Sequence, residues 1–242
     1  GRADVRATGF SRPEEIAELP KDYSFTAVAA DGCTPVRFNP CAPVHYVMNA
    51  ALAPPGGPAD VRASLERIAE ATGLTFVDDG TTDEPYGQRR APYQPDRYGE
   101  RWAPILIAWG SLGSRGEVQV VGTGRHLVVE RAAVSGTLVL NVDAVTDAGT
   151  RAPLRDGFGP VAGAGRIGPA GVTWGRVILH ELAHIVGLGH ASDPAQLMYP
   201  ETADQTTRPA NFAAGDRAGL RWLGRQAGCR ESPPLAAGAG PA

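Results

Sequence analysis

The chain has 242 residues, of which 43% are hydrophobic and 20% are charged, and its formal net charge at pH 7 is −3. This length and composition suffice for one buried core, and they predict a single main domain with irregular ends. The small net charge gives no indication of binding to nucleic acid or an anionic membrane, and no apolar run approaches the ~20 residues that cross a bilayer. We therefore expect no nucleic-acid partner, no membrane partner and a monomer.

Arginine supplies almost all of the positive charge, because Lys21 is the only lysine. Together with abundant Ala, Gly and Pro, this bias is typical of a GC-rich bacterial genome such as that of an actinobacterium. The first residues are polar and contain no apolar signal-peptide core, which is neutral because a secreted protein loses its signal on export.

Three cysteines, Cys33, Cys41 and Cys229, favour an oxidising compartment and a secreted, extracellular protein. One disulfide would leave one thiol, and three pairings are open. Cys41–Cys229 would tie the first core strand to the end of the last helix, whereas Cys33–Cys41 would close a short loop. We favour the first pairing, because closing a long loop restrains the unfolded chain more.

Hydrophobic periodicity and turn residues predict the elements of the first half of the chain. Residues 1–32 are expected to form a leader or surface wrap with one short helix near Pro13. The elements expected next are a strand at 44–48, an amphipathic helix at 58–72, a strand at 74–77 stopped by Asp78-Asp79-Gly80, a polar surface loop at 81–101 and a buried central strand at 105–109.

The second half is expected to contain three more strands and two helices. The strands are predicted at 118–121, 126–129 and 137–142, followed by a flexible Gly, Ala and Pro-rich connection at 148–171. A helix at 173–186 is apolar nearly all round, which is typical of a helix buried at the centre of a domain. A final helix is predicted at 213–227.

Three histidines and one glutamate are grouped in a short stretch. His180 and His184 are four residues apart, so a helix places both rings on one face. Gly187 can adopt the left-handed conformation that ends a helix and lets His190 turn back toward them. Three imidazoles suit a catalytic zinc site with an open fourth position, and Glu181 lies where a carboxylate can accept a proton from water. The spacing predicts that the three histidines bind Zn²⁺ and that Glu181 is the general base.

The pattern H-E-x-x-H-x-x-G-x-x-H, with Met198 eight residues after the third histidine, resembles the metzincin zinc endopeptidases. The Leu-Met-Tyr-Pro sequence at 197–200 is similar to the Met-turn of the matrixin branch. This resemblance implies the same ligands and base, with Met198 as the hydrophobic floor beneath the metal. The resemblance is strong over residues 173–200, and elsewhere it concerns only the order of strands and helices.

The fold that this resemblance implies is α+β, with a mixed, mostly parallel twisted sheet, a central zinc helix and a C-terminal helix. Residues 33–229 would form the peptidase domain, after a leader at 1–32 and before a disordered tail at 230–242. Its partners would be protein or peptide substrates.

Some residues depart from the matrixin pattern. Ala191 follows the third histidine, where matrixins usually carry serine. Other metzincin branches place a tyrosine two residues after the Met-turn methionine, but here Pro200 holds that position. Tyr199 and Pro200 are therefore assigned to the wall of the substrate pocket. Cys33 lacks the Pro-Arg-Cys-Gly context of a matrixin latency cysteine, so a disulfide or a buried thiol is favoured.

Two further residues have alternative interpretations. Arg176, one turn before His180, is at a position that reaches into the pocket in some relatives, but a solvent-facing arginine is equally compatible with the sequence. Asp216 matches a matrixin carboxylate that supports the Met-turn, but it could also be an acidic residue favoured by the helix dipole.

Additional metal sites have little support. His45 and His126 are too few for the structural zinc of many matrixins, so we predict that this second zinc is missing. Calcium could bind the oxygens of Asn141, Asp143 and Asp147, but solvated turn residues are the favoured interpretation.

The sequence thus predicts a zinc endopeptidase that binds extended substrates along an exposed sheet edge, formed by the region 118–129 or a neighbouring strand. One alternative is a secreted binding or structural protein that retains zinc without turnover. Another is an exopeptidase or amidase acting on a cell-wall substrate.

Overall fold

A five-stranded sheet with the order β2-β1-β3-β7-β6 forms the centre of the computed structural model, which describes residues 13–87, 89–112, 114–115, 118–147, 152–159, 172–200 and 208–235. The strands are β1 Val44–Asn49, β2 Phe76–Thr81, β3 Ile105–Gly110, β6 Gly122–Val129 and β7 Ala132–Asn141. β2, β1, β3 and β7 are parallel, whereas β6 pairs antiparallel with β7 and forms one edge. This confirms the α+β class and the mostly parallel sheet.

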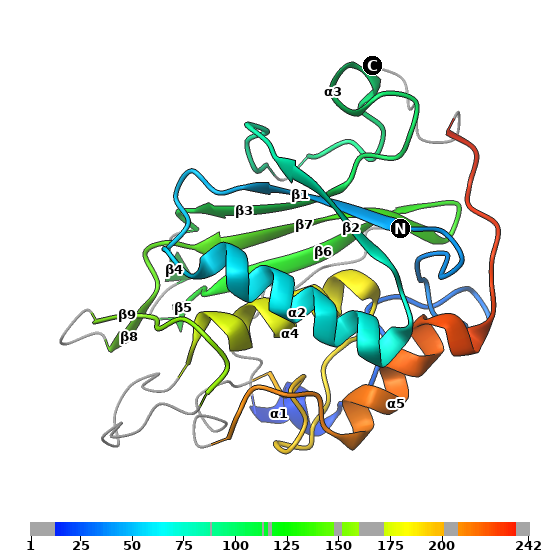
Figure 1. Cartoon of the computed structure of the whole chain (residues 1–242). Helices are drawn as coiled ribbons and strands as arrows, with labels where there is room; N and C mark the ends of the chain where they lie inside the picture. Colours follow the sequence, from blue (N-terminus) through cyan, green and yellow to red (C-terminus); the bar gives the residue numbers. More distant parts are fainter. Residues whose placement is uncertain are drawn as a thin grey trace.

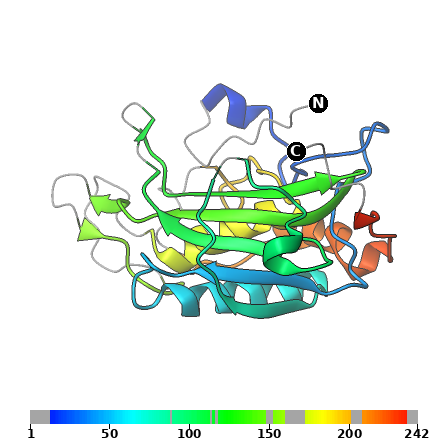
Figure 2. The same ribbon diagram turned by 90° about the horizontal axis from the view of Figure 1, so that it is seen from above.

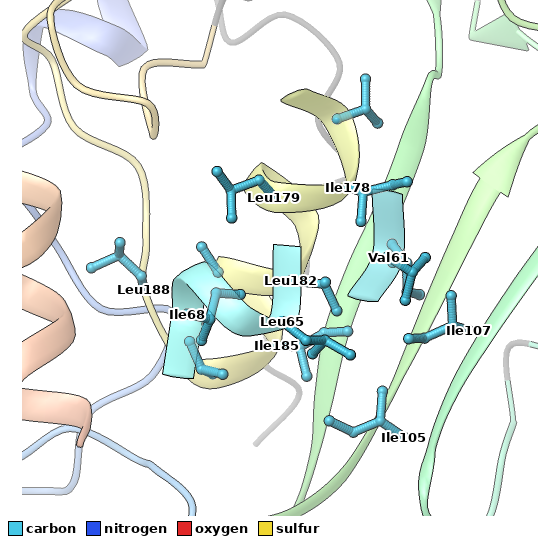
Figure 3. Packing of buried hydrophobic residues seen from close by; sticks show 14 of the residues in the cluster. Val61, Leu65, Ile68, Ile105, Ile107, Ile178, Leu179, Leu182, Ile185 and Leu188 are labelled. Atoms are coloured by element: carbon cyan, nitrogen blue, oxygen red, sulfur yellow. The ribbon is translucent and has the colours of Figure 1, made fainter. Parts of the chain in front are cut away.

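Two long helices cover one face of this sheet (Figures 1 and 2). α2 Gly57–Thr72 begins with a proline in its first turn and ends at Gly73, whose φ is 72°, and α4 Trp174–Val186 is buried at every residue. Figure 3 shows Val61 and Leu65 of α2 and Ile178 and Leu182 of α4 meeting Ile105 and Ile107 of the sheet. Burial of α4 from all sides explains why its sequence is apolar nearly all round.

The other face of the sheet is covered in part by the segment between β2 and β3, which contains α3 Pro95–Tyr98. This segment was expected to be a polar surface loop, but it contains an ion pair between Glu84 and Arg90 whose side chains are only 7% and 2% exposed. Arg90 also donates to Ser135 Oγ on β7. The two charges can be buried because they form an ion pair with each other. The bond from Arg90 to β7 attaches the loop to the sheet.

Several predicted boundaries were wrong. β2 continues through Asp78, Asp79 and Gly80, because it is an edge strand whose polar side chains face water. β6 begins at Gly122 instead of near His126, and the short strands β4 Ser114–Arg115 and β5 Val118–Gln119 form a separate pair.

The end of the chain also differs from the prediction. β7 starts at Ala132, and a strand pair, β8 Val145–Asp147 with β9 Ala152–Pro153, enters the predicted flexible connection. The rest of that connection, residues 148–151 and 160–171, lies outside the described residues. The final helix is divided into α5 Ala214–Leu223 and a 3₁₀ turn, Arg225–Ala227. A Cβ on Gly224 would lie 1.8 Å from the Thr72 carbonyl oxygen, so the chain passes directly over the end of α2.

A disulfide joins the segment just before β1 to the segment just after the last helical turn. Cys41 and Cys229 are bonded across 188 residues with a Cα–Cα distance of 5.5 Å, which confirms the favoured pairing. Cys33 is a free, exposed thiol, so the expectation that it forms a disulfide or is buried was wrong. The predicted short helix is α1 Pro13–Ala17. Among the described helices, none combines the length and apolar character needed to cross a membrane.

Candidate metal centre

Local signals at both ends of α4 set the helix that carries two of the histidines. The Thr173 hydroxyl accepts a hydrogen bond from the Arg176 N–H at the N-terminus. At the C-terminus Gly187 has a φ of 111°, and its N–H donates to helix carbonyls, including that of His184. A left-handed residue of this kind ends the helix and redirects the chain, as the sequence predicts for Gly187. His190 is reached three residues later.

The three predicted ligands converge. His180 Nε2 and His184 Nε2 lie 3.4 and 3.2 Å from His190 Nε2. The ligand nitrogens all lie within 4.8 Å of one another, and this is the one group of three or more metal-ligating side chains found among the described residues. Nitrogens on three rings at this spacing surround a point that a tetrahedral cation can occupy, since Zn–N distances are about 2.0–2.1 Å.

The rings of the two helix-borne histidines are oriented by backbone carbonyls. His180 Nδ1 is 3.0 Å from the Leu197 oxygen, and His184 Nδ1 is 2.7 Å from the Leu188 oxygen. A proton on Nδ1 leaves the lone pair of Nε2 for a metal. Burial lowers the pKa of His184 to about 4 and, together with the charge of His184, lowers that of His190 to about 3. Burial also lowers the pKa of His180 well below its ordinary value. Neutral imidazoles are the form that binds zinc.

Glu181 lies in contact with the edge strand. Its side chain is buried, and its Oε2 accepts a hydrogen bond of 2.7 Å from the Gly124 N–H of β6. A Cβ on Gly124 would lie 2.2 Å from the Glu181 carbonyl oxygen, so the strand crosses the helix in backbone contact. The carboxylate is therefore located where α4 meets the edge strand β6, on the residue after His180.

The Met-turn is held by Asp216 on α5. Its Oδ2 accepts the Leu197 N–H at 2.7 Å, its Oδ1 accepts the Met198 N–H at 3.2 Å, and Oδ2 also caps α5 at Ala213. Burial raises the pKa of Asp216, and the three N–H donors oppose this shift. Of the two interpretations from the sequence, these contacts favour the one in which Asp216 supports the Met-turn. Met198 is fully buried.

The loop that carries His190 is bound along its length by the N-terminal segment, residues 20–26. The Ser24 hydroxyl donates to the His190 carbonyl at 2.6 Å, and the Gly189 N–H donates to the Ser24 carbonyl at 2.8 Å. Thr26 donates to Gly187, and Ser192 donates to Pro20. Residues more than 160 positions away in sequence therefore help to place the third histidine.

The residues assigned to the substrate pocket are buried or partly buried. Arg176 is only 4% exposed and donates to the Arg208 carbonyl at 2.6 Å, so the solvent-facing alternative was wrong. Burial lowers the pKa of Arg176 to about 10. Pro200 is buried and Tyr199 is partly buried. Residues 201–207 lie outside the described part of the chain.

The remaining residues singled out from sequence have other contacts. His45 bonds to Asp79, and His126 Nδ1 lies 3.4 Å from the His184 carbonyl oxygen. Asn141 is buried, and its Oδ1 accepts the N–H groups of Leu112 and Asp143, so protein donors already occupy that oxygen.

Sequence reasoning missed Gly124 and Ser24. Glycine inside a strand indicates a close backbone approach, and this signal was available at Gly122 and Gly124. No sequence signal marks Ser24, because its contact depends on how distant segments align.

Comparison with known proteins agrees with the geometry. A family model described as Matrixin matches residues 94–223. Metalloendoproteinase 1 of Glycine max is 45% identical over 47 residues, which are 19% of this chain and 15% of that protein. The match thus spans well under two thirds of that relative. Because the Matrixin model covers more than half of the chain, the chain belongs to the matrixin family of metzincins, which are zinc metalloproteases.

Proposed function

We propose that this protein is a zinc-dependent endopeptidase that hydrolyses internal peptide bonds of extended protein substrates. The observation that carries the proposal is the convergence of three imidazoles at one point, with a buried carboxylate on the next residue of the same helix.

The donor set fits zinc. Three neutral nitrogen donors and no thiolate are typical of catalytic zinc sites, which keep one coordination position for water or substrate. The Leu197 and Leu188 carbonyls hold the helix-borne rings with Nε2 directed to the common point. We therefore assign His180, His184 and His190 as the ligands. When bound, zinc supplies Lewis-acid chemistry: it polarises a carbonyl oxygen and makes water a stronger acid.

Glu181 is proposed to move the proton. Its carboxylate accepts a proton as water attacks the peptide carbonyl and then delivers it to the departing amine. The N–H of Gly124 holds one oxygen of the carboxylate, which limits the orientations that the group can adopt. Met198, which is fully buried, is proposed to form the hydrophobic floor beneath the metal.

The edge strand β6 is the proposed binding surface for the substrate backbone. Among the described strands, β6 pairs only with β7, so we propose that its other side adds the substrate as a strand. Backbone pairing holds an extended peptide with little dependence on its sequence. Tyr199, Pro200 and Arg176 are proposed to line the pocket beyond the scissile bond, because Arg176 bonds to the chain that follows the Met-turn.

The catalytic unit, expected at residues 33–229, is proposed to include residues 20–26 as well and to end at about Cys229. Residues 20–26 bind the loop of the third ligand. The disulfide attaches Cys229, near the end of the unit, to Cys41. A disulfide is typical of proteins from oxidising compartments, so we propose a secreted protein.

Replacement of Glu181 tests the proposal. Glu181→Gln should bind zinc in the same stoichiometry as the wild type and lose about 10²- to 10⁴-fold in cleavage of an internally quenched peptide. Mass analysis of the products should show internal cuts. A wild-type protein that binds zinc but cleaves nothing would favour the binding or structural alternative, and products trimmed only from an end would favour an exopeptidase.

A further inference from the structure

Two glycines of β6 lie where the edge strand crosses α4. A Cβ on Gly122 would lie 3.1 Å from Val177 Cγ1 and 3.2 Å from Glu181 Cγ, which are side-chain atoms. A Cβ on Gly124 would lie 2.2 Å from the Glu181 carbonyl oxygen, which is a backbone atom of a buried helix. Side chains can shift by a few tenths of an ångström, but the backbone of α4 is packed on all sides. Of the two, Gly124 is the position where a side chain cannot be accommodated.

The backbone of Gly124 also has a direct contact with Glu181. The Asn141 N–H donates to the Val121 carbonyl, so the odd-numbered residues of this strand direct their backbone groups to β7. In an antiparallel pair the alternate residues then direct theirs to the open edge. Gly124 is one of these, and its outward N–H donates to Glu181 Oε2 at 2.7 Å. A charged acceptor makes this a strong hydrogen bond.

We propose that Gly124 is a positioning residue for Glu181. The absence of a side chain lets β6 reach the backbone of α4, and its N–H then fixes the carboxylate through Oε2. This inference rests on the proposed function, because it concerns the orientation of the general base.

The same contact affects substrate binding. An extended peptide on the open edge of β6 meets no available N–H at Gly124, because that donor is bonded to Glu181. The peptide therefore cannot use this donor, and the gap in backbone pairing lies beside the proposed base. One strand thus aligns both the substrate and the group that acts on it.

A double-mutant cycle tests the proposal. Gly124→Ala should lower kcat by about 10- to 100-fold, because a misplaced catalytic group loses rate steeply with distance. Zinc stoichiometry and KM should change much less, whereas the melting temperature should fall, because β6 and α4 must move apart to accommodate the Cβ. Gly122→Ala is the matched control, one outward position away in the same strand, and should lose much less kcat.

The cycle uses Glu181→Ala as the second background, with the residual single-turnover rate as the readout. If Gly124 acts through Glu181, then Gly124→Ala has no further effect once the carboxylate is gone. An equal loss in both backgrounds would show that Gly124 has only a structural role and would overturn the proposal. So would a Gly124→Ala protein with the wild-type kcat.

A second measurement does not depend on the folding of Gly124→Ala or on activity. In metal-free protein with isotope-labelled glycine, the Gly124 amide proton should move upfield and exchange faster in Glu181→Ala than in the wild type. An unchanged resonance would contradict the bond. If the wild type cleaves no peptide, the proposed function fails, while this amide measurement still tests the contact.

Discussion

The two parts of the metal centre are held in different ways. His180 and His184 come from a buried helix, and a backbone carbonyl orients the ring of each. His190 comes from a loop, and its position depends on the N-terminal segment through Ser24 and on the Met-turn through the Ala191 N–H, which donates to Met198. The helix supplies two ligands by its own periodicity, whereas the third is located by contacts from distant parts of the chain.

This difference indicates where the site is vulnerable. A change on α4 must disturb a helix whose thirteen residues are all buried. The loop can be disturbed from outside, at the N-terminal segment or at α5, without changing any metal ligand. Substitutions of residues that do not contact the metal should therefore lower zinc affinity. The loss should be larger for residues that hold the loop more directly.

Removing a ligand should have the largest effect. His184→Ala and His190→Ala should each reduce zinc affinity by more than the roughly 10- to 100-fold that outer-shell substitutions cost. Competition with a chromophoric chelator measures this affinity, and His45→Ala, at a half-exposed position bonded to Asp79, is the control that should bind normally. Retention of tight binding by His190→Ala would leave only the helix-borne pair as ligands.

Asp216→Asn should have the next largest effect. The carboxylate accepts three backbone N–H groups, and an amide nitrogen in its place would face at least one of these donors. Leaving a buried donor unpaired costs about 1–3 kcal/mol, which should appear in the free energy of unfolding by urea. Zinc affinity should fall about tenfold, as for other outer-shell positions. Asp96→Asn, exposed on α3, is the control. If both variants match the wild type, Asp216 does not support the Met-turn.

Gly189→Ala should have a smaller effect. Its Cβ would lie 2.3 Å from Ser24 Oγ, so the serine must leave its bond to the His190 carbonyl. We expect a loss of zinc affinity at the low end of the outer-shell range, about tenfold or less. Gly159→Ala places a Cβ in open space and should bind like the wild type. Equal affinities for the two variants would show that the N-terminal segment does not position the third ligand.

Glu84→Gln should change stability without changing zinc affinity at neutral pH. Burial acts to raise the pKa of Glu84, but hydrogen bonds from Arg90, Tyr98 and Gln94 outweigh it and the net pKa is lowered. A lowered folded-state pKa stabilises the protein above the ordinary value of 4.5, and this stability is lost as the pH falls through the lowered value. Leaving Arg90 buried without its partner costs roughly 3–5 kcal/mol.

The test of Glu84→Gln is the free energy of unfolding by urea from pH 7 to pH 3. The wild type should exceed the variant at pH 7, and the difference should shrink toward acid. A difference that is constant with pH would show that the carboxylate charge makes no contribution. A fall in zinc affinity of Glu84→Gln at neutral pH would show that this loop is coupled to the metal centre.

The elements that the sequence predicted correctly depend on local periodicity. The spacing of His180 and His184, the apolar surface of α4 and the left-handed turn at Gly187 are all encoded within a few residues. The central strand β3 and the α2 helix were predicted for the same reason. The choice of Cys41–Cys229 followed from loop entropy, which also needs no structure.

The elements that were missed depend on contacts between distant segments. Glu84 and Arg90 have no periodic relation, so a buried pair is indistinguishable in sequence from two solvated charges. Gly122 and Gly124 fell in a gap between two predicted strands, because the sequence does not show that their backbone contacts α4. The bond from Ser24 to His190 spans 166 residues, and no local pattern predicts such an alignment.

X-ray absorption at the zinc edge tests the central assignment most directly, on zinc-loaded wild type and His190→Ala. The wild type should show three imidazole nitrogens at about 2.0–2.1 Å and one oxygen ligand from water. His190→Ala should show one imidazole fewer. An unchanged number of imidazoles in the variant, or sulfur coordination in the wild type, would contradict the assignment of a three-histidine zinc centre completed by the loop.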